Sequence, residues 1–585
     1  MTRRTTALCV AILLVAIGAR VAVHFELRDY VLYEVPLVDA QDYVEWATRL
    51  VRGQGEAADV YYKAPLYPWV LAIFMRIVGP GVAAAYVLNA ALGVASVLFL
   101  GLWARRLFGT RLALVTAALA AVYGPMLYFE AQALPPPLVI LLSLVALLAL
   151  TSRGAAPSAR GLVVAGVTLG LLVLARPSCI LWTPVAALWA ARQSRPFAWR
   201  RAVVVTCVAA SVVAPVTLRN FRRGGDWVLV SANGGINFFL GNNADAARTS
   251  TLRPGLEWEE LVRRIPEAER RGQARWDRWF ARRAWSWVRD EPVQFGIGLG
   301  RKALEYCNVH EIDRNLDVRG FRSQSHVLRC APRYAWLAPW LLLGVVVVWR
   351  RGPHGQLAVL LAAASLMATA LFFVSERYKL DAIAATLPFA VGGCGELVAA
   401  IRRRSRLPLA WVVGLCAAGV GLAFPNWLGV RSVQPARAAA LQGVALYALG
   451  RNVEAIAELQ RAVAEEPGDA DAHYQLATAL RRLDRFDAAL ASFETAARLV
   501  PGNPKPHAGA GLVLRQLNRP VEALERYRDA LREDPTNVLL LFETGEILEQ
   551  LGRRAEAHAQ YAAALRIGGD AQLMAELRRR VRRLE

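Results

Sequence analysis

Two carboxylates and a lysine stand close together after the first apolar segment of this 585-residue chain. The stretch VDAQDYVEWATRL, residues 38–50, carries Asp39 and Asp42, and YYKAPLYP, residues 61–68, carries Lys63. A carboxylate can take the proton of an attacking hydroxyl group, and cations can stabilise a departing phosphate. These residue types therefore suit the displacement of a phosphate from a carbon atom by a hydroxyl group.

The composition places the chain among membrane proteins. Hydrophobic residues make up 55% of the sequence, and the mean hydropathy of +0.31 is too high for an average soluble protein. The net charge is +22, but the arginines gather in short clusters between apolar runs, where they set the orientation of the chain in a bilayer. The charge thus argues against nucleic-acid binding.

Apolar runs long enough to cross a bilayer recur along the first 425 residues. A transmembrane helix needs about 20 mostly apolar residues. We identify eleven such runs: 7–23, 82–104, 111–129, 134–151, 160–176, 178–192, 200–217, 335–350, 355–374, 379–400 and 407–424. The sequence therefore predicts an all-α protein with a polytopic bundle of about eleven spans.

One further apolar run, 65–79, decides the orientation of the bundle. It is short and carries two prolines and an arginine. If it does not cross the membrane, the arginine clusters between later spans fall on the side of the N-terminus, as the positive-inside rule requires. We therefore expect an interfacial or re-entrant helix there, a cytoplasmic N-terminus, and two outer loops at 24–81 and 218–334.

The second outer loop is long enough to fold. It contains an extended glycine-rich piece, DWVLVSANGGINFFLGNN at 226–243, and a tryptophan-rich amphipathic helix, ARWDRWFARRAWSWVRDEP at 274–292. We expect this helix to lie on the bilayer surface, to pack as part of a small cap, or to do both. Cys307 and Cys330 share a polar stretch, so a disulfide between them stays open.

The composition changes after residue 425 to alanine-rich, charged and helical sequence. Three series of residues recur at intervals of 34 positions: Pro467, Pro501 and Pro535; Ala455, Ala489, Ala523 and Ala557; and Gly450, Asp484, Asn518 and Gly552. This period, with small residues at packing positions, resembles the tetratricopeptide repeat. We predict a membrane domain at 1–425, a linker at 426–435, and a solenoid of about four repeats at 436–585 on the outer side.

Polar and charged residues gather at the outer ends of the predicted spans. They are Glu130, Arg176, Arg219, Asn220, Arg377, Tyr378 and Lys379. Any one of them can be a simple anchor at the interface, but arginines on the outer side oppose the positive-inside bias. A polyprenyl-phosphate sugar fits the pattern, because its lipid tail lies in the bilayer, its phosphate at the interface and its sugar in water.

The order of one helix, an outer loop with D-x-x-x-Y, and a K-A-P-L-Y-P turn resembles bacterial membrane glycosyltransferases of the GT-C superfamily. The branch is that of protein O-mannosyltransferases and aminoarabinose transferases, and the pattern spans Asp39 to Tyr43 and Lys63 to Pro68. The resemblance implies that Asp39 is the general base of an inverting transfer. Many relatives have an adjacent acidic pair, but residue 40 is alanine here, which leaves Asp42 or Glu130 as the second carboxylate. A divalent metal held by Asp39 and Glu130 also stays open.

Three later segments are similar to elements of the same relatives: TLRNFRRGGDWVLVSANGGINFFLGNN, GRKALEYCNVHEIDRN and SERYKLD. From their position at the outer ends of the predicted spans, we expect the donor phosphate to be bound by Arg176, Arg219, Arg377 and Lys379. We expect further substrate contacts from Tyr43, Lys63, Asn220, Asn242 and Tyr378.

The leading interpretation is a multi-pass glycosyltransferase of the bacterial inner membrane. It would move a hexose or pentose from a polyprenyl-phosphate donor to a protein, lipid or glycan acceptor on the periplasmic side. The repeats, which eukaryotic transmembrane O-mannosyltransferases also combine with such a core, suggest a protein or peptide acceptor or partner. Two alternatives remain: a surface-polysaccharide ligase or polymerase centred on the second outer loop, and a non-catalytic scaffold that acts through its repeats.

Overall fold

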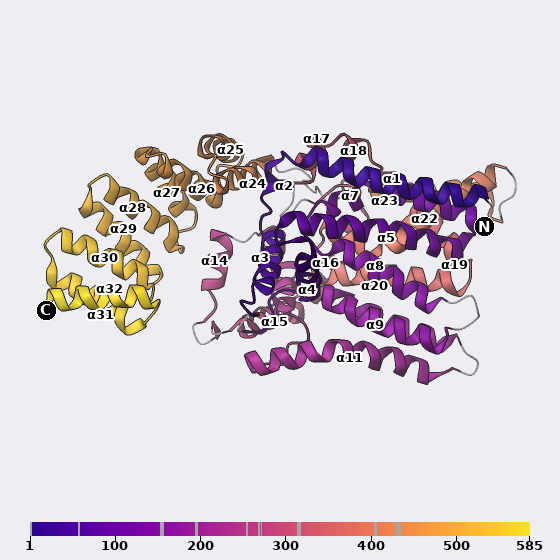
Figure 1. The fold of residues 1–585 in the computed structure, drawn as a ribbon, viewed down its shortest axis with the longest axis horizontal. Helices are drawn as coiled ribbons and strands as arrows, with labels where there is room; N and C mark the ends of the chain where they lie inside the picture. Colours follow the sequence, from indigo (N-terminus) through magenta and orange to yellow (C-terminus); the bar gives the residue numbers. More distant parts are fainter. Residues whose placement is uncertain are drawn as a thin grey trace. The chain divides into compact units, whose positions relative to one another are not determined.

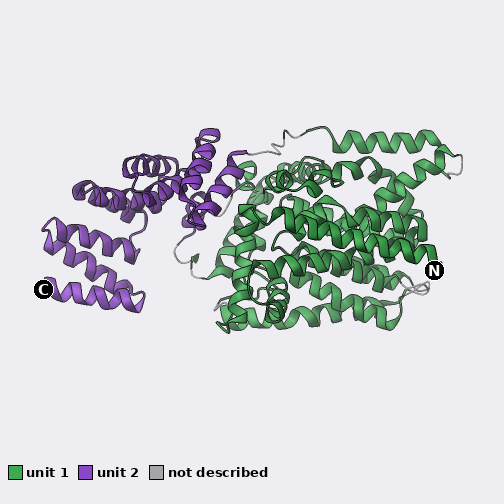
Figure 2. Ribbon diagram, turned by 45° about the horizontal axis from the view of Figure 1, so that its top comes forward, with its two compact units in different colours: residues 1–251, 267–433 green, residues 252–266, 434–585 purple. Residues whose placement is uncertain are grey.

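A computed structural model describes residues 3–56, 59–151, 157–193, 197–252, 255–266, 269–270, 272–312, 317–402, 406–427, 429 and 435–585. These ranges contain helices and turns and no β-strand, so the all-α prediction is confirmed. The chain forms two compact units, one of residues 1–251 and 267–433 and the other of residues 252–266 and 434–585 (Figure 2).

The first unit is a bundle of long helices with shorter helices at one end. Its elements are α1 Arg3–Leu27, α2 Val31–Glu34, α3 Asp39–Val51, α4 Leu66–Val78, α5 Val82–Phe108, α6 Thr110–Ala121, α7 Gly124–Glu130, α8 Pro136–Leu150, α9 Ala159–Ala175, η1 Pro177–Leu181, α10 Trp182–Arg192, α11 Trp199–Gly224, α12 Gly234–Gly241, α13 Ala246–Thr249, α15 Gln273–Asp290, α16 Pro292–Cys307, α17 Val318–Gln324, α18 His326–Cys330, α19 Tyr334–Trp349, α20 Pro353–Leu371, α21 Glu376–Lys379, η3 Leu380–Ala382, α22 Ile383–Ile401 and α23 Leu409–Ala423. The helices α3, α4 and α15 lie together at one end of the long helices (Figure 1).

Several of these helices are long and apolar enough to cross a membrane, and the chain is a multi-pass membrane protein. The six helices that meet both conditions are Arg3–Leu27, Val82–Phe108, Trp199–Gly224, His326–Trp349, Pro353–Leu371 and Glu376–Ile401. A seventh is added if α6 and α7, which are bent by 47° at their junction, form one span. The described helices thus support six or seven candidate spans, and the larger predicted number requires the shorter helices α8, α9, α10 and α23 to cross as well.

A buried ion pair joins α1 and α7. Arg20 and Glu130 are 3% and 2% exposed, and the Arg20 Nη2 donates to Glu130 Oε1 at 2.8 Å. Arg20 Nε lies 2.7 Å from Glu130 Oε2, and Arg20 Nη1 donates to the carbonyl groups of Ala16 and Ala121. On α5, a Cβ atom added to Gly93 would lie 2.0 Å from Glu130 Oε1, so the glycine makes room for the carboxylate.

We expect Gly93→Ala to lower the stability of the membrane unit, because the added methyl group displaces Glu130 from Arg20. Breaking a buried pair costs about 3–5 kcal/mol. The measurement is the melting temperature of the detergent-extracted chain, with Gly18→Ala as control, because a Cβ atom at Gly18 meets nothing within 4 Å. Equal melting temperatures for the two variants would contradict this role of Gly93.

The second outer loop folds into helices. Part of its glycine-rich piece is not extended as predicted, because Gly234–Gly241 forms α12, and the Ile236 N–H donates to Asp277 Oδ1 at 3.0 Å near the start of that helix. The tryptophan-rich helix α15 packs on α12 through buried Phe280 and leaves Trp285 53% exposed. Contact of α15 with the bilayer surface stays a prediction. Cys307 and Cys330 are both free thiols.

The second unit consists of helix pairs with the predicted period. Its helices are α14 Leu256–Arg263, α24 Pro435–Ala448, α25 Asn452–Glu465, α26 Ala470–Arg482, α27 Phe486–Leu499, α28 Pro504–Gln516, α29 Pro520–Glu533, α30 Val538–Gln550, α31 Arg554–Ile567 and α32 Ala571–Leu584. The turn inside each pair has a positive φ: 76° at Gly450, 56° at Asp484, 57° at Asn518 and 73° at Gly552. Glycine, asparagine and aspartate tolerate this left-handed conformation best, which explains the recurring series.

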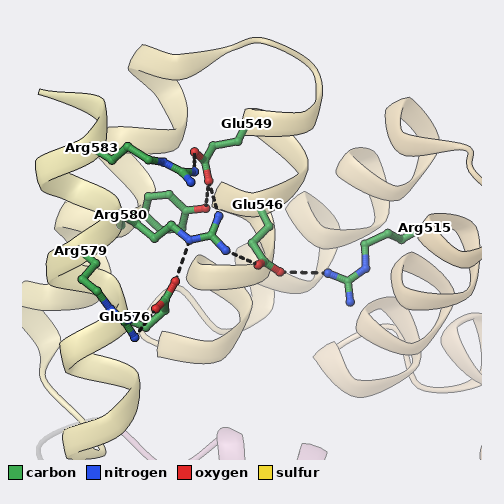
Figure 3. Close-up of polar contacts among 8 residues, drawn as sticks. Arg515, Glu546, Glu549, Glu576, Arg579, Arg580 and Arg583 are labelled. Carbon is green, nitrogen blue, oxygen red and sulfur yellow. Dashed lines mark hydrogen bonds and ion pairs between the residues drawn. The ribbon is translucent and has the colours of Figure 1, made fainter.

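An ion network holds the last helix, α32, to the repeats (Figure 3). Arg580 lies 2.6 Å from Glu549, 3.1 Å from Glu546 and 2.9 Å from Glu576. Glu546 also accepts from Arg515 of α28 at 3.1 Å. Part of the positive charge of the C-terminal helix is therefore neutralised by acidic residues of α30.

Candidate active site

A strained turn places Asp39 at the start of α3. Val38 has φ 54° and ψ −120°, and the Ala40 N–H donates to the Leu37 carbonyl group at 3.2 Å. This geometry is that of the first central residue of a type II′ turn, a position that normally holds glycine. A β-branched residue with this conformation costs about 1–3 kcal/mol, and such strain concentrates at functional sites.

The carboxylate of Asp39 lies between two cations. Lys63 Nζ is 2.6 Å from its Oδ1, and Arg377 Nη1 is 2.6 Å from its Oδ2. Lys63 also contacts Asp42 Oδ2, so both acidic residues of the opening stretch share one ammonium group. The Asp39 side chain keeps 22% of its surface exposed and the Asp42 side chain 59%. Residues 338 positions apart, Asp39 and Arg377, thus meet in one site.

The ionisation of this cluster is set by the competition between burial and charge. Burial favours the neutral form of Asp39, but the Arg377 and Lys63 charges outweigh it and hold the pKa of Asp39 well below its usual range. Burial lowers the pKa of Lys63, but Asp39 outweighs it and raises the pKa above its usual value. Because the pKa of Asp39 is depressed, both ion pairs persist as the pH falls and are lost only near that lowered pKa.

Arg176 extends the cluster. Its Nη1 lies 2.6 Å from Asp381 Oδ1 and donates to the Arg377 carbonyl group at 3.2 Å. The guanidinium groups of Arg176 and Arg377 lie 5.0 Å and 5.2 Å from the centroid of the Tyr378 ring, within cation–π distance. On the other side, Lys63 Nζ lies 5.5 Å from the centroid of the Tyr43 ring, and burial raises the pKa of Tyr43 to about 12.

Lys379 points to a different set of partners. Its Nζ lies 2.7 Å from Glu376 Oε1 and donates to the Asn308 carbonyl group at 2.9 Å. A cavity beside Glu376 is lined by charged side chains such as Glu311 and Arg333 and by apolar ones such as Phe129 and Val318. Lys379 is therefore near this cavity through Glu376 and takes no part in the pairing of Asp39.

The predicted phosphate ligand Arg219 and the predicted substrate contact Asn220 lie in a second cluster that fixes the first outer loop. Arg219 lies 3.8 Å from the Tyr61 ring centroid and donates to the Asp59 carbonyl group at 2.8 Å. Asn220 is fully buried, accepts from the Tyr61 N–H at 3.2 Å, and donates to the carbonyl groups of Val228 and Val230. Because Tyr61 is two residues before Lys63, this cluster fixes the loop segment that carries the lysine.

Asn242, which belongs to the second outer loop, is likewise bound by other groups of the protein. Its Nδ2 donates to the carbonyl groups of Phe238 and Leu371 at 2.8 Å, and its Oδ1 accepts from Lys302 Nζ at 2.8 Å. Lys302 also donates to the Phe372 carbonyl group at 3.1 Å, and burial lowers the pKa of this lysine to about 8. Both polar ends of Asn242 are thus occupied by protein groups.

Glu130 is not brought to Asp39. Its carboxylate is occupied by Arg20, whereas the carboxylate of Asp39 is occupied by Lys63 and Arg377. The two acidic residues that we considered as metal ligands therefore do not share a site. Within the described ranges, no group of three or more His, Cys, Asp or Glu side chains has the arrangement of a metal site.

Several residues of these clusters were missed by sequence reasoning. Asp381 and Glu376 stand in the quoted motif SERYKLD, where the basic residues drew attention and their acidic partners did not. Arg20 lies inside the first apolar run, and a charge at such a depth indicates a buried partner. Lys302 stands in the quoted segment GRKALEYCNVHEIDRN but was given no role, and no sequence signal pointed to the strain at Val38.

We expect Val38→Gly to raise the melting temperature of the chain, because glycine adopts this φ and ψ without strain. The gain is about 1 kcal/mol or more. Val44→Gly is the matched control, since the same exchange inside α3 weakens a helix. A lower melting temperature for Val38→Gly, like that of the control, would show that the turn is not strained.

Comparison with known proteins covers both units. Residues 62–218 match the sequence profile described as dolichyl-phosphate-mannose-protein mannosyltransferase. That range contains Lys63 and Arg176 and leaves Asp39 and Arg377 outside it. Residues 446–511 and 509–571 match two profiles of the tetratricopeptide repeat.

No curated protein sequence matches the chain significantly. Solved structures with similarity include MamA, at 23% identity over 23% of this chain and 77% of that chain, with a TM-score of 0.22. A second is YrrB, titled a TPR protein with an unusual peptide-binding site, at 18% identity over 31% and 87%, with a TM-score of 0.23. A third is the first TPR of Spaghetti (RPAP3) bound to an HSP90 peptide, at 24% identity over 20% and 94%, with a TM-score of 0.20. These values support no functional assignment.

Proposed function

Because the N-terminal region of this chain is a glycosyltransferase of the dolichyl-phosphate-mannose-protein mannosyltransferase family, followed by tetratricopeptide repeats, we propose that it uses a polyprenyl-phosphate sugar as donor. The acceptor is a hydroxyl group of a protein, lipid or glycan on the outer face of the bacterial inner membrane. The observation that carries this proposal is the carboxylate of Asp39 between Lys63 and Arg377, with a quarter or less of each side chain exposed.

The proposed reaction is an inverting displacement at the anomeric carbon. The acceptor hydroxyl oxygen attacks that carbon while Asp39 takes its proton, and the bond from carbon to the phosphate oxygen breaks. Polyprenyl phosphate leaves with the electron pair of that bond. Its negative charge is stabilised by Arg377 and Arg176, whose guanidinium groups both lie within cation–π distance of the Tyr378 ring.

The ion pairs of Asp39 also indicate how the base is activated. As long as Lys63 and Arg377 are paired with it, the depressed pKa makes Asp39 a weak proton acceptor. A donor phosphate attracts the same two cations, and sharing them raises the pKa of Asp39 toward its usual value. The donor therefore activates the base by its arrival, and without the donor the base stays inactive.

We propose the following orientation for the chain. If α8, α9, α10 and α23 cross the bilayer as well, there are about eleven spans, the N-terminus is cytoplasmic and the repeats are periplasmic. The membrane domain would then extend over 1–425 and the repeat domain over 436–585, with the linker at 426–435. In this arrangement the repeats bind a protein or peptide, as acceptor or partner.

We expect Asp39→Asn to lower the rate of sugar transfer by at least about 100-fold, because the amide cannot accept the hydroxyl proton. The measurement is transfer from a labelled polyprenyl-phosphate sugar in membranes that contain the variant. Asp42→Asn is the matched control, since that side chain is mostly exposed and shares Lys63 without a second cation. Full transfer by Asp39→Asn would refute its role as base, and a larger loss in Arg219→Ala would favour a ligase centred on the second loop.

We expect Arg377→Gln to shift the acid limb of the pH profile of kcat/KM to higher pH. Removal of the cation lets the pKa of Asp39 rise, so that Asp39 becomes protonated, and inactive as a base, at a higher pH than in the unaltered chain. The KM for the donor rises as well, because one phosphate ligand is lost. A lower kcat with an unshifted acid limb would show that Arg377 does not set the ionisation of Asp39.

A further inference from the structure

A short segment of the second outer loop folds together with the repeats. Residues 252–266, which include α14, belong to the same compact unit as residues 434–585 (Figure 2). Leu256, the first residue of α14, is 2% exposed and packs in an apolar cluster with Ala470, Ala496 and Val500. The repeats therefore cover the apolar residue at the start of this helix.

The backbone of Leu256 is also bound. Its N–H donates to Asp471 Oδ1 at 2.8 Å, and its carbonyl group accepts from Asn503 Nδ2 at 3.0 Å. A Cβ atom added to Gly255 would lie 2.4 Å from the Asp471 carboxylate, so the preceding residue must be small. One turn further on, Glu259 pairs with Lys505 at 2.5 Å and accepts from Asn503 Nδ2 at 3.2 Å. The repeats therefore contact the side chain, the N–H and the carbonyl group of Leu256, and also the carboxylate of Glu259.

The residues that make these contacts occupy equivalent places in successive repeats. Asp471 and Lys505 are 34 positions apart (505 − 471), which places both at the start of the first helix of a pair. Asn503 is fully buried, and while its Nδ2 binds α14, its Oδ1 accepts from the Lys505 N–H and caps α28. In the next pair the equivalent Asn537 uses its Nδ2 on Asp534 of its own turn. The contact is thus specific to this place along the solenoid.

We propose that Asp471, Val500, Asn503 and Lys505 form a receptor surface for a short acidic helix with the pattern Gly-Leu-x-x-Glu. In this chain α14 occupies that surface, and a protein acceptor or partner with the same pattern binds there by displacing α14. Lys505 supplies the charge that the glutamate requires, and it is one of four lysines in the chain. The inference rests on the proposed role of the repeats in peptide binding and not on the chemistry at Asp39.

The test measures binding of a fluorescent peptide, Gly-Leu-Glu-Trp-Glu-Glu-Leu-Val-Arg, to the full-length chain in lipid nanodiscs. The unaltered chain binds it weakly, because the tethered α14 competes at a high effective concentration. Leu256→Asp frees the surface, and we expect the peptide to bind at least about tenfold more tightly. Glu259→Lys is a second way to release α14 and is expected to have the same direction of effect.

A charge reversal provides the control for misfolding. Lys505→Glu, combined with Leu256→Asp, should abolish binding of the peptide, and a peptide with lysine at the position of Glu259 should restore it. Equal binding by the unaltered chain and both release variants, or failure of the reversed peptide, would overturn the proposal. Asp39→Asn is expected to bind the peptide like the unaltered chain, so loss of sugar transfer and loss of peptide binding are separable.

Discussion

Charged groups in apolar surroundings must be paired, and this requirement organises the membrane unit. An unpaired charge at such a depth costs several kcal/mol. Arg20 is therefore matched by Glu130, Arg176 by Asp381, and Asp39 by both Lys63 and Arg377. Since the members of these pairs come from distant parts of the sequence, each pair joins two elements of the bundle.

Exposure separates the pairs into two kinds. The side chains of Arg20 and Glu130 are each 3% exposed, and Gly93 leaves no space beside the carboxylate for another group. Asp39 keeps 22% of its side chain exposed and Arg377 keeps 25%. The pair of Asp39 is therefore more accessible to a substrate than the pair of Arg20 and Glu130. Position at the outer end of a span is therefore not enough to identify a reactive carboxylate. The partners and the exposure of the carboxylate are needed as well.

The parts of the structure that follow local rules were predictable. The interval of 34 residues gave the helix pairs, and the series from Gly450 to Gly552 gave the turns, because a positive φ restricts the residue type. The two motifs around Asp39 and Arg377 were found, but their direct contact depends on how α3 and α21 pack. Arg20 inside a span signals a buried partner, but its identity as Glu130 depends on how α1 packs against α7. The contact of α14 with the repeats likewise depends on residues about 215 to 247 positions apart.

The ion pairs of the substrate-free site take the place of the negative charge that a phosphate substrate would bring. A phosphate site at the membrane needs cations, but those cations require counter-charges before the substrate arrives. Carboxylates of the chain fill that need, and in the proposed reaction Asp39 becomes the stronger base when it loses its cations to the phosphate. The same logic applies to the repeats, where α14 satisfies Asp471, Asn503 and Lys505 and, on our proposal, gives way to a competing segment. On both proposals, an internal group holds the place of a ligand in its unit, and binding is an exchange of partners instead of the filling of an empty site.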